Sequence, residues 1–185
     1  MATKYSDINL TTSLAVYFAQ KLNESGWRVY WQATDSYSGI ATLGTVTLVP
    51  ELPNEPGFLV LPPRERVANE VIVPAFSVNI SKQPRDVELE GLGSEIFEEE
   101  ASFVIQGFVV DRAQSMAFAT MFRNFFRPQF RLIVRDFETD PTNPTIVDDT
   151  NTVVNSRDVE RIDFTDLPQP VRYYLNAEIN ITYFD

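Results

Sequence analysis

The stretch that decides the fold is VRYYLNAEINITYF, residues 171–184. Apolar and aromatic side chains occupy every second position of its main part, and polar ones, among them Asn176, Glu178 and Asn180, lie between them. A period of two is typical of a strand with one buried and one solvated face. The alternating residues are Tyr173, Leu175, Ala177, Ile179, Ile181 and Tyr183. The pattern predicts a long terminal antiparallel strand in a sheet that is covered on one side.

Two segments upstream predict partners for this strand. Residues 101–110, ASFVIQGFVV, are apolar on both faces, which favours a central strand buried on two sides. Residues 130–137 place Phe130, Leu132 and Val134 inward and Arg131 and Arg135 outward. Both segments are short enough to be strands and too short to be typical helices.

The N-terminal half carries weaker strand signals. Residues 27–34 and 40–49 are rich in aromatic and β-branched residues, and the polar turn between them predicts a hairpin. Residues 71–80 alternate as well, but Pro74 removes a ladder donor and favours an edge strand or a bulge. Residues 83–86, QPRD, are typical of a turn.

Two amphipathic helices are expected. The first begins at Ser6 or Asp7, whose side chains can accept free amide hydrogens, and Gly26 can end it in the left-handed conformation. The second follows Asp111 or Ser115. The apolar stripe is Leu10, Leu14, Tyr17, Phe18 and Leu22 in the first helix and Phe118, Met121, Phe122 and Phe125 in the second. Phe126 lies off this stripe, in a position suited to an interface.

Two proline-punctuated segments are expected to be loops, the first of them alternatively an irregular edge. Residues 50–63 contain five prolines, and residues 140–156 are polar, with a short strand predicted after them at 158–164. Because such loops often bind partners, we expect interface residues there: Pro53, Asn54, Glu55, Pro56, Asp140, Pro141, Asp148 and Asp149. Together these elements predict an α+β fold: a mainly antiparallel β-sheet flanked on one face by two α-helices, with long loops. We expect one domain over 1–185, with elaborations at about 50–63 and 138–170.

The composition excludes much ordinary enzymology. The 185 residues include no Cys and no His, so Ser-His-Asp and Cys-His triads and thiolate or imidazole metal sites are ruled out. Phosphate-binding loops and nucleophile elbows are also lacking. A net charge of −11 argues against gripping duplex DNA. No leader and no membrane span is expected, which favours synthesis in a cytoplasm. We expect no catalytic residue, no cofactor and no metal.

Three alternatives for the polar and aromatic clusters were weighed. Paired carboxylates can hydrolyse glycosides, but the runs Glu98-Glu99-Glu100 and Asp148-Asp149 are typical of solvated surfaces. An oxygen-ligated Ca²⁺ at Asp140, Asp148 and Asp149 matches no known loop spacing. The aromatic residues of the first strand region could stack on a sugar or a base, although packing is their more ordinary use: Trp27, Tyr30, Trp31 and Tyr37.

The middle of the chain resembles a known family. The segment Val73-Pro74-Ala75-Phe76 is followed by Glu90-Gly91-Leu92-Gly93-Ser94, and then by the step from Phe108-Val109-Val110-Asp111 to Arg112-Ala113-Gln114. In this order the segments resemble the tail-terminator, or tail-completion, proteins of tailed bacteriophages. The order of elements from Thr11 to Phe137 is consistent with that family, and the match covers about two-thirds of the chain.

The resemblance implies a structural virion protein and no enzyme. It implies a homo-hexameric ring that caps the tail tube, joins it to a head-completion or neck protein, and lets DNA pass through its lumen. An acidic lumen wall suits such passage, and Glu98, Glu99 and Glu100 are candidates for it. Two other readings remain open: another phage neck component, such as a head-closure or adaptor protein, and a β-rich carbohydrate-binding module.

Overall fold

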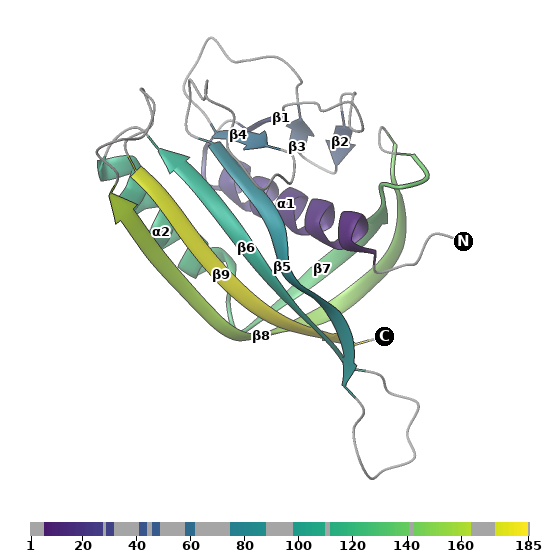
Figure 1. Cartoon of the computed structure of the whole chain (residues 1–185). Helices are drawn as coiled ribbons and strands as arrows, with labels where there is room; N and C mark the ends of the chain where they lie inside the picture. Colours follow the sequence, from purple (N-terminus) through teal and green to yellow (C-terminus); the bar gives the residue numbers. More distant parts are fainter. Residues whose placement is uncertain are drawn as a thin grey trace.

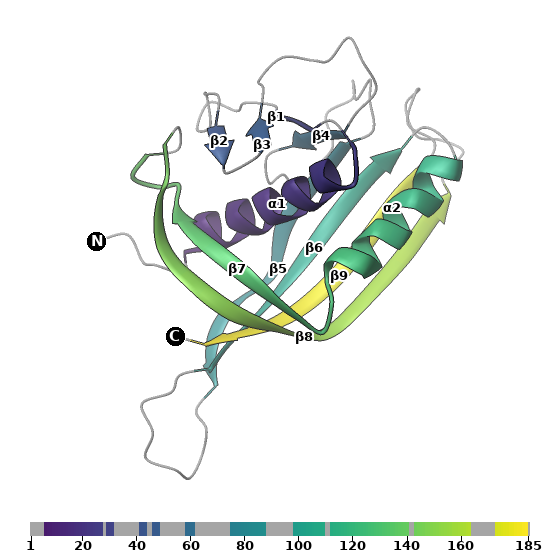
Figure 2. The ribbon, with the colours of Figure 1, turned by 180° about the vertical axis from the view of Figure 1, so that it is seen from behind.

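The protein is built on one curved seven-stranded sheet with both helices packed against the same face (Figure 1 and Figure 2). The computed structural model describes residues 6–27, 29–31, 41–43, 46–48, 58–61, 75–87, 98–109, 112–140, 143–163 and 173–184. The helices are α1 (Asp7–Glu24) and α2 (Arg112–Phe125). The seven strands, in spatial order, are β1 (Val29–Trp31), β4 (Phe58–Leu61), β5 (Ala75–Val87), β6 (Glu98–Val109), β9 (Tyr173–Phe184), β8 (Thr145–Asp163) and β7 (Gln129–Asp136). The α+β fold is therefore the one that the sequence predicted.

The terminal strand occupies the middle of this sheet, as predicted. β9 pairs antiparallel with β6 along its whole length and with β8 along most of it. Ala177 and Ile179 are fully buried on its inner face, which is the face that the helices cover. Because both of its edges are paired, β9 holds the two halves of the sheet together.

The region after β7 differs from the prediction. Residues 140–156 were expected to be a loop, but β8 begins at Thr145 and runs for 19 residues. Its first half pairs with β7 and its second half with β9. Threonines take inward positions that usually hold apolar residues: Thr150 is 4% and Thr152 0% exposed. β-branched threonine suits a strand, so the polar composition concealed a regular element.

The first strands also pair differently from the prediction. The hairpin expected between residues 27–34 and 40–49 is not seen among their described residues, where β1 pairs in parallel with β4. The second segment instead folds on itself, with β2 (Ala41–Leu43) antiparallel to β3 (Val46–Leu48). The sequence Gly44-Thr45 between them is of the Gly-X type that two-residue hairpins favour. β4 lies inside the segment 50–63 that was expected to be a loop.

β5 is an interior strand at its start and not the predicted edge. From its first residue, Ala75, it pairs with β4 on one side and β6 on the other. Residues 83–86, which were predicted to form a turn, lie within β5. The ladder between β5 and β6 shifts register between Ile80 and Lys82 and again between Lys82 and Arg85. The chain therefore continues through residues 83–86 as an irregularly paired strand and does not reverse its direction there.

The core is an aromatic cluster centred on Phe18 of α1. The Phe18 ring meets five other rings at centroid distances of 4.8 to 6.4 Å, within the range of favourable aromatic pairs. They belong to Phe76, Phe118, Phe122, Phe125 and Phe126. Phe126 is 0% exposed and nearly parallel to Phe18, so the interface role suggested for it is wrong. It lies just past the end of α2, where the helical stripe no longer sets its direction.

α1 closes the β7 edge of the sheet. The Ser6 side chain accepts from the Asn9 amide and begins the helix, and Gly26 follows its end at φ +88°. The Asn9 carbonyl oxygen accepts from the Phe137 amide at 2.8 Å, and the Ser13 hydroxyl accepts from the Arg135 amide at 3.0 Å. Two side chains one helical turn apart thus satisfy donors two residues apart on the strand. α1 therefore satisfies backbone donors at this sheet edge that a further strand would otherwise satisfy.

Candidate functional site

Neither described helix covers the outer face of the sheet (Figure 1). The side chains described on this face of β5, β6, β9 and β8 are mostly polar. Cross-strand partners share a face, so the register assigns its members. One row runs Asn79, Val104, Glu178, Asp158, and the next runs Ser77, Gln106, Asn176, Glu160. The Asn79 amide donates to Ser77 and to Gln106 at 3.3 Å, and Ser102 donates to Asn180. This face is a hydrogen-bonded polar surface and not an uncovered core.

Three carboxylates gather on this outer face, and we call them the acidic patch: Asp158, Glu160 and Glu178. Glu178 lies directly opposite Asp158, and Glu160 is two residues along the same strand. Asp158 and Glu160 are exposed, and Glu178 is half-buried. Like charges directly opposite in a sheet are destabilising, typically by a few tenths of a kcal/mol to about 1 kcal/mol. Folding does not require this repulsive arrangement. The acidic patch therefore indicates that the negative surface has a function.

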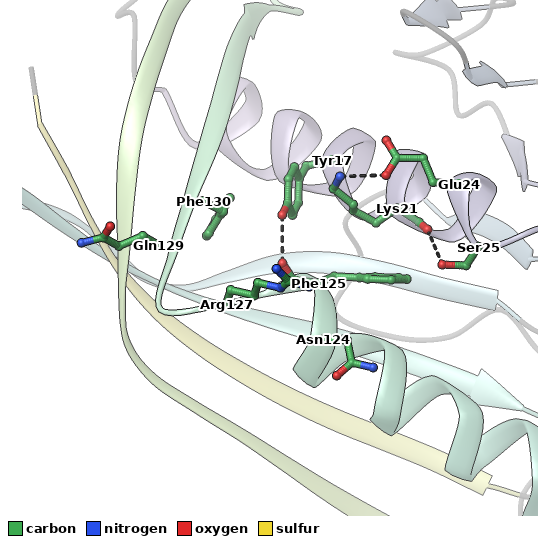
Figure 3. Close-up of a pocket in the computed structure, with 9 residues that line it drawn as sticks. All are labelled: Tyr17, Lys21, Glu24, Ser25, Asn124, Phe125, Arg127, Gln129 and Phe130. Atoms are coloured by element: carbon green, nitrogen blue, oxygen red, sulfur yellow. Dashed lines mark hydrogen bonds and ion pairs between the residues drawn. The ribbon is translucent and has the colours of Figure 1, made fainter.

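A pocket of about 370 Å³ lies on the helix side, between the end of α1 and the junction of α2 with β7 (Figure 3). Its aromatic lining is Tyr17, Phe125 and Phe130, and the Tyr17 and Phe130 ring centroids are 4.7 Å apart. Its polar lining is Lys21, Glu24, Ser25, Asn124, Arg127 and Gln129. Lys21 and Glu24 form an ion pair at 2.7 Å. The pocket thus has an aromatic floor and a rim of mixed charge.

Tyr17 is fixed in this pocket. Its hydroxyl donates to the Phe125 carbonyl at 2.9 Å, which ties α1 to the last turn of α2 (Figure 3). Burial raises the pKa of the Tyr17 hydroxyl to about 12, with a further contribution from the nearby Glu24 carboxylate. The hydroxyl is therefore a neutral donor at physiological pH, and it supplies no nucleophile or base.

Three of the interface residues expected from the sequence lie in the described part of the chain: Asp140, Asp148 and Asp149. Asp148 and Asp149 lie in β8 and not in a loop, and Asp149 forms an ion pair with Arg131. Asp140 accepts from the Asn143 amide at 3.0 Å, which is a turn-forming contact. Pro53, Asn54, Glu55, Pro56 and Pro141 lie outside the described residues. Asp149 thus has an ion-pair partner within this chain, and Asp140 stabilises a turn.

The proposed lumen residues Glu98, Glu99 and Glu100 begin β6 and pair with the end of β9. The directions of their side chains lie outside what is described. Trp27 packs against the core, so it does not offer a free stacking surface, and the side chains of Tyr30 and Trp31 and all of Tyr37 lie outside the described parts.

The sequence pointed to part of the acidic patch and missed the rest. The period of two in β9 already placed Glu178 on the polar face. Asp158 and Glu160 reach the same surface only through the register between β8 and β9, which shifts between Val154 and Ser156. Short sequence patterns do not carry information on such a bulge.

Within the described ranges, no group of three or more acidic, His or Cys side chains is arranged to hold a metal ion. No helix in the described part of the chain has the length and apolar character needed to cross a bilayer. The sequence matches no protein-family profile, and it matches no curated protein.

Proposed function

We propose that the protein is a structural subunit of a bacteriophage virion, and that it forms a ring at the head-proximal end of the tail. The ring terminates the tail tube and joins it to the neck or head-completion proteins, and DNA passes through its lumen. The likeness of residues 73–114 to tail terminators supports this proposal. In this proposal the ring is a hexamer assembled in the host cytoplasm.

The observation that carries the proposal is the acidic patch on the uncovered face of the sheet. A lumen through which DNA moves must not hold phosphates, and negative walls repel them. A sheet of paired long strands also resists deformation better than loops do, because its backbone donors are already satisfied. We therefore assign the outer face of β5, β6, β9 and β8 to the lumen, and Glu98, Glu99 and Glu100 at the start of β6 stay candidates for its wall.

A charge reversal on this face tests the assignment. Glu160→Lys should leave assembly unchanged and raise the affinity of the rings for duplex DNA, because each subunit places one new cation on the wall. The gain should fall steeply as salt is raised, since phosphate contacts release counterions. Glu138→Lys is the matched control, because Glu138 is equally an exposed glutamate but lies between β7 and β8. Equal DNA binding by the two variants would refute the lumen assignment.

The function itself is tested in infected cells. A virus that lacks this protein should produce tails of irregular length that are not attached to heads, and the protein supplied in trans should restore joined virions. Normal joined virions without the protein would refute the proposal. Tails of correct length that fail only at head attachment would instead favour a head-closure or adaptor role.

A further inference from the structure

Exposed apolar side chains gather on the outer face of the β7–β8 hairpin. Ile146 is 57% exposed, Ile133 38% and Val147 37%. Ile146 lies opposite Arg135, and Ile133, two residues earlier on β7, lies opposite Asp149. We call these five residues the hairpin knob. Large exposed apolar side chains grouped within a charged border are typical of an interaction surface.

The hairpin knob and the pocket lie on opposite faces of the same ribbon. Along β7, Phe130 points to α1 and lines the pocket, and side chains alternate, so Ile133 and Arg135 point the other way. Phe130 and Arg135 are five residues apart, about 17 Å along the strand. One subunit therefore carries a projecting surface and a recess that it cannot bring together itself.

The two surfaces have complementary chemistry. The pocket offers an aromatic floor to an aliphatic side chain. α1 and α2 both end at it, and the C-terminal carbonyls of helices carry partial negative charge. These carbonyls suit Arg135, and Arg127 suits Asp149, which also pairs with Arg131 in its own chain. Lys21 and Glu24, which pair with each other, add both charges to the rim. An apolar centre inside a rim of both charges is the usual anatomy of a protein–protein interface.

We propose that the hairpin knob of one copy docks into the pocket of a second copy of this chain, with Ile146 as the central side chain. The contact is head-to-tail, because it joins two different surfaces, and repeated contacts of this kind generate a closed ring when the rotation closes. The inference rests on the ring of the proposed function and names the contact that builds it. The acidic patch, on the more central strands, then remains free to face the lumen.

One variant in the hairpin knob and one at the pocket test the two surfaces of the contact separately. Ile146→Asp places a charge at the centre of the hairpin knob, and Asn124→Trp fills the pocket from an exposed position on its rim. Met116→Asp is the control for the first, because Met116 is 59% exposed on α2. Thr120→Trp is the control for the second, because Thr120 is exposed one turn earlier on α2 and does not line the pocket. Circular dichroism establishes that all four variants fold.

Sedimentation equilibrium measures the outcome. Ile146→Asp and Asn124→Trp should each weaken self-association about 30-fold or more, as expected for a central interface residue, and the two controls should assemble as the wild type does. Mixing the two weakened variants should give a heterodimer and nothing larger, because one hairpin knob and one pocket remain intact between them.

Three results would overturn the inference. Rings of Ile146→Asp or Asn124→Trp with wild-type affinity would show that another surface builds the ring, while leaving the proposed function intact. A mixture of the weakened variants that stays monomeric would show that the contact is not head-to-tail between these two surfaces. Wild-type protein that stays monomeric both in solution and on tail tubes would overturn the ring, and with it the proposed function.

Discussion

Gly107 leaves room in β6 for the Phe118 ring, and its replacement by alanine tests how tightly the core is packed. A Cβ at position 107 would lie 2.9 Å from two carbon atoms of that ring, closer than carbon atoms approach one another. Neither side can move easily. β6 is paired on both edges at Gly107, and Phe118 is 0% exposed with its ring 5.5 Å from that of Phe18.

The expected loss of stability follows from two opposing effects. Overpacking a tight core costs about 1–3 kcal/mol, whereas removing a glycine from a strand gains about 0.5–1 kcal/mol. Gly107→Ala should therefore lower the free energy of unfolding by about 1–2 kcal/mol. For a domain of this size the melting temperature should fall by about 2–8 °C. Urea unfolding followed by circular dichroism measures the first quantity directly.

A double-mutant cycle identifies the cause. Phe118→Leu removes the ring atoms that meet the new methyl group, so Gly107→Ala should be neutral or slightly stabilising in that background. Gly26→Ala is the control, because Gly26 has φ +88° and nothing within 4 Å of its Cβ position. The stability lost in Gly26→Ala comes from backbone conformation. It should be the same in the wild-type and the Phe118→Leu backgrounds. A Gly107→Ala protein as stable as the wild type, or equal costs in both backgrounds, would refute the packing described here.

Three further changes test other parts of the structure. Asn9→Ala should cost about 1–3 kcal/mol, because the buried Phe137 amide loses its acceptor, and hydrogen exchange at Phe137 should accelerate while that at Arg135 changes less. Stability should fall as pH rises from 10 to 12, because the Tyr17 hydroxyl ionises in the unfolded chain near 10 and in the folded protein near 12. Tyr17→Phe should remove that part of the decline in urea titrations, and an unchanged slope would contradict the burial of this hydroxyl. Glu178→Lys should raise stability by about 0.2–1 kcal/mol, because it places opposite charges at the Asp158 pair, and a loss of stability in thermal melts would contradict the register.

Local periodicity predicted the elements whose buried faces are apolar. α1, α2, β6, β7 and β9 are where the sequence placed them, because one face of each must avoid water and the spacing of its side chains shows which face. Residues such as Leu14, Phe118 and Ile179 report this directly. The α+β class follows from the same signal.

The errors lie where burial and polarity disagree. Thr150 and Thr152 are buried hydroxyl residues, so the first part of β8 had no apolar stripe and was mistaken for a loop. The end of β8 was predicted correctly as a strand at 158–164. The parallel pairing of β1 with β4 depends on contacts between segments about 30 residues apart, which no local pattern contains. Proline content misled in the same way at Pro74, which stands just before β5 and not within it.

The candidate sites were harder to predict from the sequence than the fold was. The pocket and the acidic patch both depend on how distant segments are aligned with one another. The pocket joins residues about 100 positions apart, such as Tyr17 and Phe125, and the acidic patch needs the bulge between Val154 and Ser156. Charge runs stood out in the sequence, but Asp149 pairs with Arg131 and has a structural partner. The carboxylates that define the outer face are dispersed in sequence and meet only across strands.

The central claim is that this chain closes the end of a tail tube as a ring, and electron microscopy of the protein mixed with the tail-tube subunit of its virus tests it most directly. The account predicts one ring at one end of each tube, with the outer face of β6, β9 and β8 toward the lumen and the β7–β8 hairpin against the neighbouring subunit. Tubes with bare ends beside monomeric protein, or rings whose lumen is lined by α1 and α2, would contradict it.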